Sequence, residues 1–246
     1  MYRFLLTKQW LVLTLICLIL VPSFYELSQW QWRRLELRRE FNTAITSNQA
    51  KPPREIAELL DPTASTIAQG SQWRTVTMSG YWDTEHQVLV RRRSLNTHVG
   101  FWVATPFVTS ATTIIVVRGW HEAGLTSRDT PTIANPSSEL SQVTVRIRDA
   151  QARTKPVPRD LPLSQVDLLV PAEIYPELVV TNAYGELESC TPVCSEGLVL
   201  LSAPTISEGP HQSYAFQWII FALLTVVGWG IFFRNALIAQ ASPPEN

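Results

Sequence analysis

The residues with the clearest capacity for chemistry stand at the start of an apolar run, in GPHQSYAFQWIIFALLTVVGW, residues 209–229. A set of residues spaced four, three, four, three and four apart shares one face of the helix predicted here: His211, Ala215, Trp218, Ala222, Thr225 and Trp229. Neutral imidazole is a common ligand of metal ions and haem iron. His211 is therefore a candidate ligand. The alternative is a helix cap or an interfacial side chain in the headgroup region.

The same spacing predicts that this helix packs against another helix. Ala215 and Ala222 are small enough for a neighbouring backbone to approach closely, and Thr225 can hydrogen-bond across such a contact. Tyr214 and Gln217 lie on a different face of the helix. The sequence therefore predicts a helix-contact face with a histidine at its upper end.

The segment CTPVC contains two close thiols, Cys190 and Cys194. Outside the cytoplasm two such thiols tend to oxidise, so a local disulfide that clamps a loop is expected. Copper binding or thiol exchange is the alternative, because the spacing resembles that of copper-delivery proteins with a thioredoxin fold. Those proteins need a parallel βαβ core, which this chain does not show.

Two arginines lie among apolar residues, where an unpaired charge is costly. Arg118 ends an apolar strand, so it needs an acidic group of the fold or a carboxylate of a partner. Arg34 falls within a stripe predicted to face protein: Trp30, Leu37, Phe41 and Ile45. Arg39 lies off that stripe and is expected to be dispensable.

Several function classes are excluded by composition and motif. A net charge of −1 argues against a nucleic-acid partner, and the chain has no nucleophile-elbow, phosphate-loop or zinc-protease motif. Asp83, Glu85 and His86 form a small acidic and imidazole cluster, but turns collect such residues. We therefore expect no catalytic residue and no metal site.

The elements that must position these residues begin with two uncharged apolar runs, Gln9–Tyr25 and Gln212–Phe233. Each is long enough to cross a hydrocarbon core of ~30 Å at ~1.5 Å per residue. A cleaved secretory signal is the alternative for the first run. Arginines flank both ends of the first run, so counting positive charges on its two sides does not decide the orientation. We expect both termini in the cytoplasm and the long middle segment outside.

The middle of the chain predicts a mostly antiparallel sheet, closed into a small barrel, so the fold class is an α+β membrane protein. Strands are expected at residues 73–82 with a turn at Gly80, and at 87–93, 100–107, 112–120, 142–148, 166–170, 177–181 and 197–201. A helical turn is expected at 171–175. The predicted organisation is a cytoplasmic N-terminus (1–8), a membrane helix (9–27), a helical extension with a short helix at 54–60 (28–60), a β-rich domain (73–203), a second membrane helix (212–233) and a cytoplasmic tail (234–246).

Four segments occur in a recognisable order. They are LSQWQWRR (27–34), GYW (80–82) with VLVRRR (88–93) and 100–106, VRGW (117–120), and GPHQSYAFQW (209–218). Together they resemble the surfeit locus protein one family, assembly factors of cytochrome c oxidase. Ser28 stands where the family usually has glycine, and Arg92 and Val117 stand where it usually has asparagine.

The resemblance implies a bacterial plasma-membrane protein, not an enzyme, that helps to place haem a in the catalytic subunit of the oxidase. It makes His211 the leading haem-ligand candidate, with Trp218 against a transiently bound haem a. Its expected partners are the oxidase subunits and membrane lipid. The motif residues implied as partner contacts or structural elements are Trp30, Gln31, Arg34, Arg118, Gly119, Trp120, Tyr214 and Gln217. The alternatives are an extracytoplasmic copper or thiol-redox protein using Cys190 and Cys194, and a structural accessory subunit of the oxidase.

Overall fold

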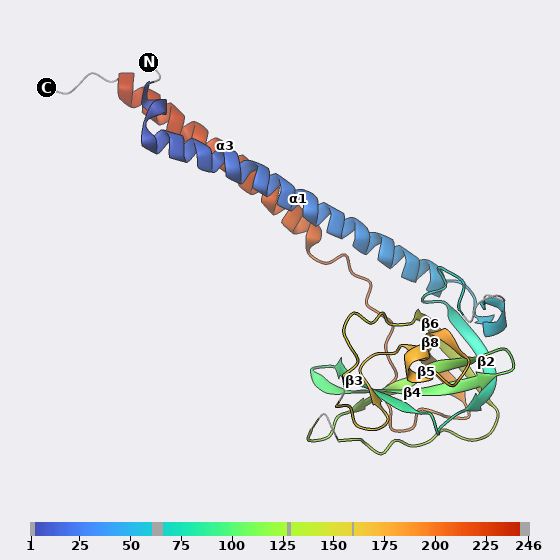
Figure 1. Ribbon diagram of the computed structural model, residues 1–246. Coiled ribbons are helices and arrows are strands. Elements are labelled where there is room, and N and C mark those ends of the chain that lie inside the picture. Colours follow the sequence, from blue (N-terminus) through green and yellow to red (C-terminus); the bar gives the residue numbers. More distant parts are fainter. Residues whose placement is uncertain (1–2, 61–65, 127–128, 159, 242–246) are drawn as a thin grey trace. The chain divides into compact units, whose positions relative to one another are not determined.

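A computed structural model describes residues 3–60, 66–126, 129–158 and 160–241. The chain forms two compact units. One contains Met1–Thr43 and Thr205–Asn246, and the other is Ala44–Pro204. The first unit is helical and the second is built on a β-sheet (Figure 1).

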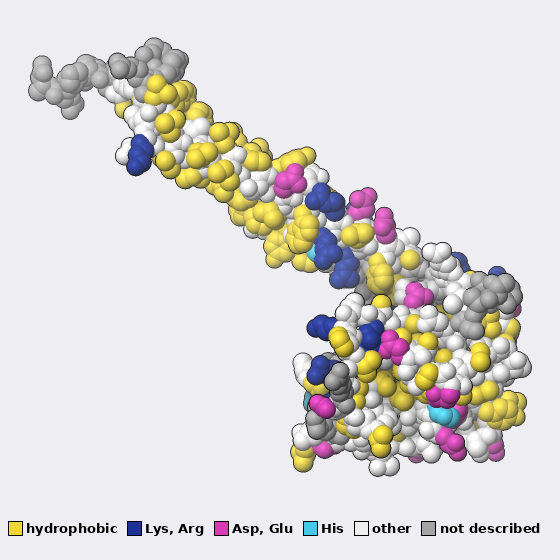
Figure 2. Space-filling model, viewed as in Figure 1, with side chains coloured by type: hydrophobic (Ala, Val, Ile, Leu, Met, Phe, Trp, Pro, Cys, Tyr) yellow, Lys and Arg dark blue, Asp and Glu magenta, His cyan; other side chains and the backbone are white. Residues whose placement is uncertain are grey.

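The helical unit contains a short 3-10 helix, η1 (Arg3–Leu6), and two long helices, α1 (Lys8–Gln49) and α3 (His211–Ala241). Both long helices are apolar and long enough to cross a membrane, each with a window of mean hydropathy 2.0. They run side by side in opposite directions (Figure 1), and the Phe4 and Phe233 rings lie 5.9 Å apart. The start of α1 and the end of α3 therefore lie at the same end of the pair. Figure 2 shows mainly hydrophobic side chains over that half of the pair and charged ones gathering on the other half.

The predicted extension of the first helix is confirmed, because α1 has 42 residues and continues to Gln49. At ~1.5 Å per residue that is about 63 Å, roughly twice a hydrocarbon core. Pro22 lies inside this helix. The helix α3 continues past Phe233, where the predicted membrane span ends, to Ala241.

The described residues of the β unit form eight strands in one sheet, with one short helix and one 3-10 turn. The strands are β1 (Arg54–Glu55), β2 (Thr75–Trp82), β3 (Val88–Leu95), β4 (His98–Thr109), β5 (Thr113–Glu122), β6 (Ser141–Asp149), β7 (Gln165–Val166) and β8 (Val180–Thr191). The turn η2 (Ile56–Glu58) follows β1, and the helix α2 (Pro171–Ile174) precedes β8. The predicted helical turn at 171–175 is α2. The prediction of a helix at 54–60 was wrong, because β1 and η2 occupy most of that stretch.

Five strands close into a ring, which confirms the predicted small barrel. The order is β2, β6, β8, β5 and β4, and β4 pairs again with β2. Only the pairing of β5 with β8 is parallel within the ring. Gly80 is the residue at which β2 pairs with both β6 and β4, and an added Cβ would lie 2.1 Å from the Val108 carbonyl oxygen. The predicted turn at Gly80 was wrong, because the strand continues and the glycine permits close backbone approach.

The interior of the barrel is apolar because alternate residues of each strand point inward. Val143, Val145 and Ile147 of β6 are fully buried, as the alternation predicted. They join inward residues of the other strands in one core: Val76, Met78, Trp82, Phe107, Ile114, Val116 and Leu187. The predicted central position of β5 is confirmed, since β4 and β8 flank it.

The C-terminal third of the β unit differs most from the sequence-based expectation. Three short strands were predicted, but β8 is one strand of 12 residues and β7 has two. Glu186 and other polar residues interrupt the apolar pattern of β8. Glu186 is nevertheless buried, because Arg146 and Arg148 of the neighbouring β6 pair with its carboxylate.

Candidate functional site at the start of α3

The predicted helix-contact face of α3 packs against α1. The Ser28 hydroxyl donates a hydrogen bond to the Ala215 carbonyl at 3.0 Å, and the Trp218 ring stacks on Phe24 at 5.7 Å. Deeper in the pair, the Trp229 indole N–H donates to the Thr14 hydroxyl at 3.1 Å. Ser28 and Ala215 are both fully buried, so two small residues allow the helices to approach closely here.

His211 is oriented by a side chain of α1. Its Nδ1 lies 2.9 Å from Oε1 of Gln31, and Gln31 is only 9% exposed. An amide oxygen can only accept, so Nδ1 carries the proton and donates it to Gln31. The lone pair of the neutral ring is then on Nε2. The pair joins two segments that are 180 residues apart in the sequence.

Gly209 lies beside the other nitrogen of this imidazole. Its φ is +68°, and a Cβ added there would lie 3.6 Å from His211 Nε2. The glycine N–H donates to the Ser207 hydroxyl at 3.1 Å, which fixes the turn before α3. The positive φ requires glycine here, and the missing side chain leaves space on the Nε2 side of the ring.

The segment before α3 is attached to α1 by polar contacts. Arg39 forms a bidentate ion pair with Glu208, with nitrogen to oxygen distances of 2.8 and 3.0 Å. The Asn42 amide donates to the Ser207 carbonyl at 3.2 Å. The guanidinium of Arg39 lowers the pKa of the Glu208 carboxyl. This pair is exposed, and exposed ion pairs contribute little to stability, so the expectation that Arg39 is dispensable stays a prediction.

Trp30 and Arg34 are exposed among the described residues, which corrects their part of the predicted stripe, whereas Ile45 at its end is buried as predicted. Trp30 is 47% exposed, Arg34 is exposed, and the Arg34 guanidinium lies 5.9 Å from the centre of the Trp30 ring. The face of α1 that is buried here runs through Ser28, Gln31 and Leu35 instead. Of the three predicted contact residues Trp30, Gln31 and Arg34, only Gln31 belongs to this face.

Tyr214 and Gln217 are exposed on the side of α3 away from that face. Tyr214 is 45% exposed. They do not join His211 and Gln31, and their predicted role in partner contact stays a prediction.

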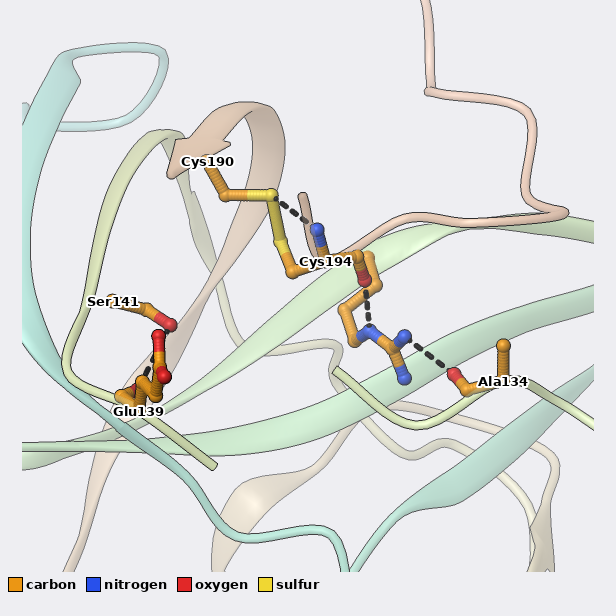
Figure 3. The surroundings of a disulfide bond; sticks show 6 residues. Ala134, Glu139, Ser141, Cys190 and Cys194 are labelled. Carbon is orange, nitrogen blue, oxygen red and sulfur yellow. Dashed lines mark hydrogen bonds between the residues drawn. A yellow bond between two sulfur atoms is a disulfide. The ribbon is translucent and has the colours of Figure 1, made fainter. Parts of the chain in front are cut away.

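Arg118 has a structural position within the β unit. It is fully buried and donates three hydrogen bonds of 2.7 Å, to the carbonyls of Cys194 and Ala134 and to Oε1 of Gln87 (Figure 3 shows Cys194 and Ala134). Burial lowers its pKa to about 10. Among the described residues its acceptors are neutral oxygens, so the predicted acidic partner within the fold is not found. The predicted carboxylate of another protein is not found either, because the buried side chain is out of its reach.

The neighbours of Arg118 in its motif also hold the β unit together. An added Cβ on Gly119 would lie 2.8 Å from Leu198 Cβ, so the glycine allows the segment near residue 198 to approach β5. The Trp120 indole N–H donates to the Arg93 carbonyl at 2.7 Å, and its backbone N–H donates to Val199. Gly119 and Trp120 therefore carry packing rather than a binding site.

Cys190 and Cys194 are joined by a disulfide (Figure 3). Cys194 is buried, and its backbone N–H donates to the sulfur of Cys190 at 2.9 Å. Its carbonyl is the one that accepts from Arg118. Within the described ranges no group of three or more His, Cys, Asp and Glu residues could hold a metal ion.

Sequence reasoning missed four polar residues that organise α1: Ser28, Asn42, Asn48 and, from the facing segment, Glu208. Asn48 donates to the carbonyls of Gly70 and Gln72 at 2.7 and 2.9 Å. The small residue Ser28 was the one available signal, because small residues mark close helix contacts. The partners of Asn42, Asn48 and Glu208 lie 22 to 169 residues away, and no local pattern predicts them.

Comparison with known proteins finds one matching family model, described as the SURF1 family, over residues 18–223. The chain is also 30% identical over 260 residues to uncharacterized SURF1-like proteins of Mycobacterium bovis and of two Mycobacterium tuberculosis strains. Each match covers 99% of this chain and 92% of the relative.

Proposed function

Because the chain belongs to the SURF1 family, we propose that it is a membrane-bound assembly factor for cytochrome c oxidase that helps to place haem a in the haem-bearing subunit. The family is associated with assembly of this oxidase, and its members are generally assembly factors rather than enzymes. The observation that carries the haem part of the proposal is the pairing of His211 with Gln31.

The residues around His211 fit a haem iron in the chemistry of their donor groups. Histidine ligands of metals commonly donate their second ring N–H to a carbonyl or carboxylate, which fixes the ring and makes the ligand nitrogen more basic. Gln31 does this for Nδ1, and Gly209 leaves room beside Nε2. When bound, haem a supplies the redox-active iron of the oxidase. The role of this chain is to hold and orient it.

The position of the site suits delivery at a membrane surface. His211 is the first residue of α3, where the apolar run begins. A group held there lies at the boundary between headgroups and hydrocarbon, where an apolar macrocycle and its charged propionates both find suitable surroundings. We place the protein in a bacterial plasma membrane with both termini in the cytoplasm and His211 near the outer surface.

A His211→Ala variant tests the proposal. The detergent-purified protein from cells that make haem A should lose haem-dependent absorbance while its membrane level stays normal. Gln31→Leu should keep haem at reduced occupancy with a shifted spectrum, because the ligand ring loses its orientation. Gln217→Leu, on the exposed side of the same helix, is the matched control and should bind haem like the wild type.

The proposal fails if His211→Ala binds haem as well as the wild type. His211 is then a cap for the first turn of α3. A deletion strain with normal haem a absorbance and normal oxidase in its membranes would contradict the assembly role itself.

A further inference from the structure

A second face of α1 carries residues at alternating intervals of four and three, and we call it the outer seam. Its members are Ile16, Leu20, Ser23, Leu27, Trp30, Arg34 and Leu37. All seven side chains are exposed. The side of α1 that faces α3 and the segment before it has the same spacing about a third of a turn away, and its residues are buried or half-buried: Thr14, Cys17, Val21, Phe24, Ser28, Gln31 and Leu35. A repeat averaging 3.5 residues is the pattern by which helices pack side by side.

Lipid accounts for the lower part of the outer seam but not for its upper part. The uncharged run of α1 ends at Tyr25, and Leu37 lies twelve residues further on, about 18 Å at ~1.5 Å per residue. The headgroup layer on one side of a bilayer is only about 5–8 Å thick. A helix tilt of ~20° leaves Leu37 well beyond that layer. Leu37 is 56% exposed and Trp30 is 47% exposed, so apolar surface continues into water.

Arg34 places a positive charge on the outer seam. It lies between Trp30 and Leu37, and its guanidinium contacts the Trp30 ring at 5.9 Å. Arg39, five residues further along on another side of the helix, donates to both carboxylate oxygens of Glu208. The chain thus supplies a carboxylate for Arg39, while the guanidinium of Arg34 remains exposed on the outer seam.

A second copy of this chain does not fit the outer seam. Copies inserted by the same route have the same orientation in the membrane, so two seams can meet only in parallel. A parallel pair places each residue of the seam opposite its own equivalent. Arg34 then faces Arg34, and like charges directly opposite each other are unfavourable.

We propose that the outer seam binds a transmembrane helix of another protein. That helix continues past the outer surface of the bilayer, presents apolar residues to Trp30 and Leu37, and carries an aspartate or glutamate opposite Arg34. The planar arginine fork accepts a carboxylate in bidentate geometry, which fixes the register of the two helices. The inference rests on the proposed function for the expectation that the partner is a membrane protein, and it does not need haem binding.

Photo-crosslinking in membranes of the native cell tests the proposal. A p-benzoylphenylalanine replacing Leu37 should crosslink to a membrane protein. The attachment point should lie in the peptide that directly follows a transmembrane helix of that protein, with an Asp or Glu within one helical turn of it. The same probe replacing Glu36, which is exposed but off the outer seam, should give at least tenfold less product. Arg34→Glu should lower the Leu37 yield at least tenfold, and Arg34→Lys should lower it less.

Five outcomes overturn the proposal. Three are a crosslink mainly to a second copy of this chain, to its own β unit, or to lipid. The other two are equal yields from Leu37 and Glu36, and the absence of any product at normal protein level. The haem spectrum of Arg34→Glu separates this inference from the proposed function, because it should match the wild type. His211→Ala should retain the Leu37 crosslink.

Discussion

Arg118 and Arg34 both have apolar neighbours in the sequence, but they lie in opposite surroundings. Arg118 is fully buried among carbonyl oxygens, and Arg34 is exposed on the side of a helix. The sequence predicted that each needs a partner, which holds for Arg118, although its acceptors are neutral. These acceptors lie 16 to 76 residues away, so their identity could not be predicted.

Replacing Arg118 should destabilise the β unit strongly. Arg118→Ala leaves three acceptors without a donor and opens a cavity, so we expect a loss of about 3 kcal/mol or more. The apparent Tm of the detergent-purified protein, followed by tryptophan fluorescence, measures this. Arg54→Ala, at an exposed position in β1, should change stability by less than ~0.5 kcal/mol. Equal shifts for the two variants would contradict the structural role of Arg118.

At His211 the sequence predicted the residue and its face but not its partner. The spacing from His211 to Trp229 indicated a helix contact, and that contact is made by α1. Gln31 was named through a motif, without a physical reason to connect it to His211. The stripe of Trp30, Leu37, Phe41 and Ile45 looked more apolar, but only Ile45 of these is buried, and α1 packs against α3 through a different face. The face that contacts α3 instead combines apolar residues such as Phe24 with the polar Ser28 and Gln31.

Among the elements, strands with alternating or wholly apolar residues were predictable and β8 was not. Its polar residues are compatible with a buried strand only because β6 supplies Arg146 and Arg148. Such a cross-strand pair depends on register, which a single segment does not encode. The same limit applies to Gly80, because a glycine within a strand pattern is typical both of a turn and of a close backbone approach.

The loop closed by Cys190 and Cys194 should depend on its disulfide. Replacing both cysteines with serine removes a short cross-link, which for a loop of about five residues is worth ~2 kcal/mol. It also loosens the Cys194 carbonyl that accepts from Arg118. We expect a lower Tm and an unchanged haem spectrum. Mass analysis without reductant should find the native disulfide, and two free thiols would contradict it.

An ion-pair cluster links the loop after β6 to the segment around β7 and α2, and it predicts a pH dependence. Arg153 pairs with Asp167 at 2.9 Å and with Glu173, and it lowers the pKa of the Asp167 carboxyl. A carboxyl with a lowered folded-state pKa stabilises the fold above its ordinary pKa of ~3.9. That contribution is lost as the pH falls through the folded-state pKa.

Asp167→Asn should therefore lower the Tm at pH 7, and its difference from the wild type should shrink as the pH falls below about 4. Thermal melts between pH 7 and pH 3 measure this difference. Asp160→Asn, at an exposed position, is the control and should show no such convergence. A Tm difference for Asp167→Asn that is constant across the range would exclude the ion pair as its cause.

For the whole molecule, the two apolar runs and the barrel followed from sequence because length, hydropathy and strand alternation are local properties. The antiparallel pairing of α1 and α3 brings Phe4 close to Phe233. If both helices cross the bilayer, the two ends of the chain lie on one side of it. The sequence could not decide which side, because Arg33, Arg34 and Arg38 oppose the residues near Met1 in the charge rule.

Reporter fusions should establish the orientation. A fluorescent protein joined after residue 246 should be fluorescent, because we expect that end in the cytoplasm. Alkaline phosphatase joined after residue 204, before α3, should be active, because we expect the β unit outside. An inactive phosphatase fusion together with a non-fluorescent C-terminal fusion would reverse the topology and remove the disulfide from an oxidising compartment.

The contact of Ser28 with Ala215 joins residues 187 positions apart, so the ribosome makes one long before the other. At synthesis rates of ~5–20 residues per second, α3 follows α1 by roughly 10 to 40 seconds. During that interval α1 has no second helix to pack against, and Gln31 has no histidine to orient. The outer seam, in contrast, is complete as soon as α1 has been made. A partner that recognises the outer seam can bind the nascent chain before His211 has been synthesised. The order of synthesis therefore allows docking to precede haem binding.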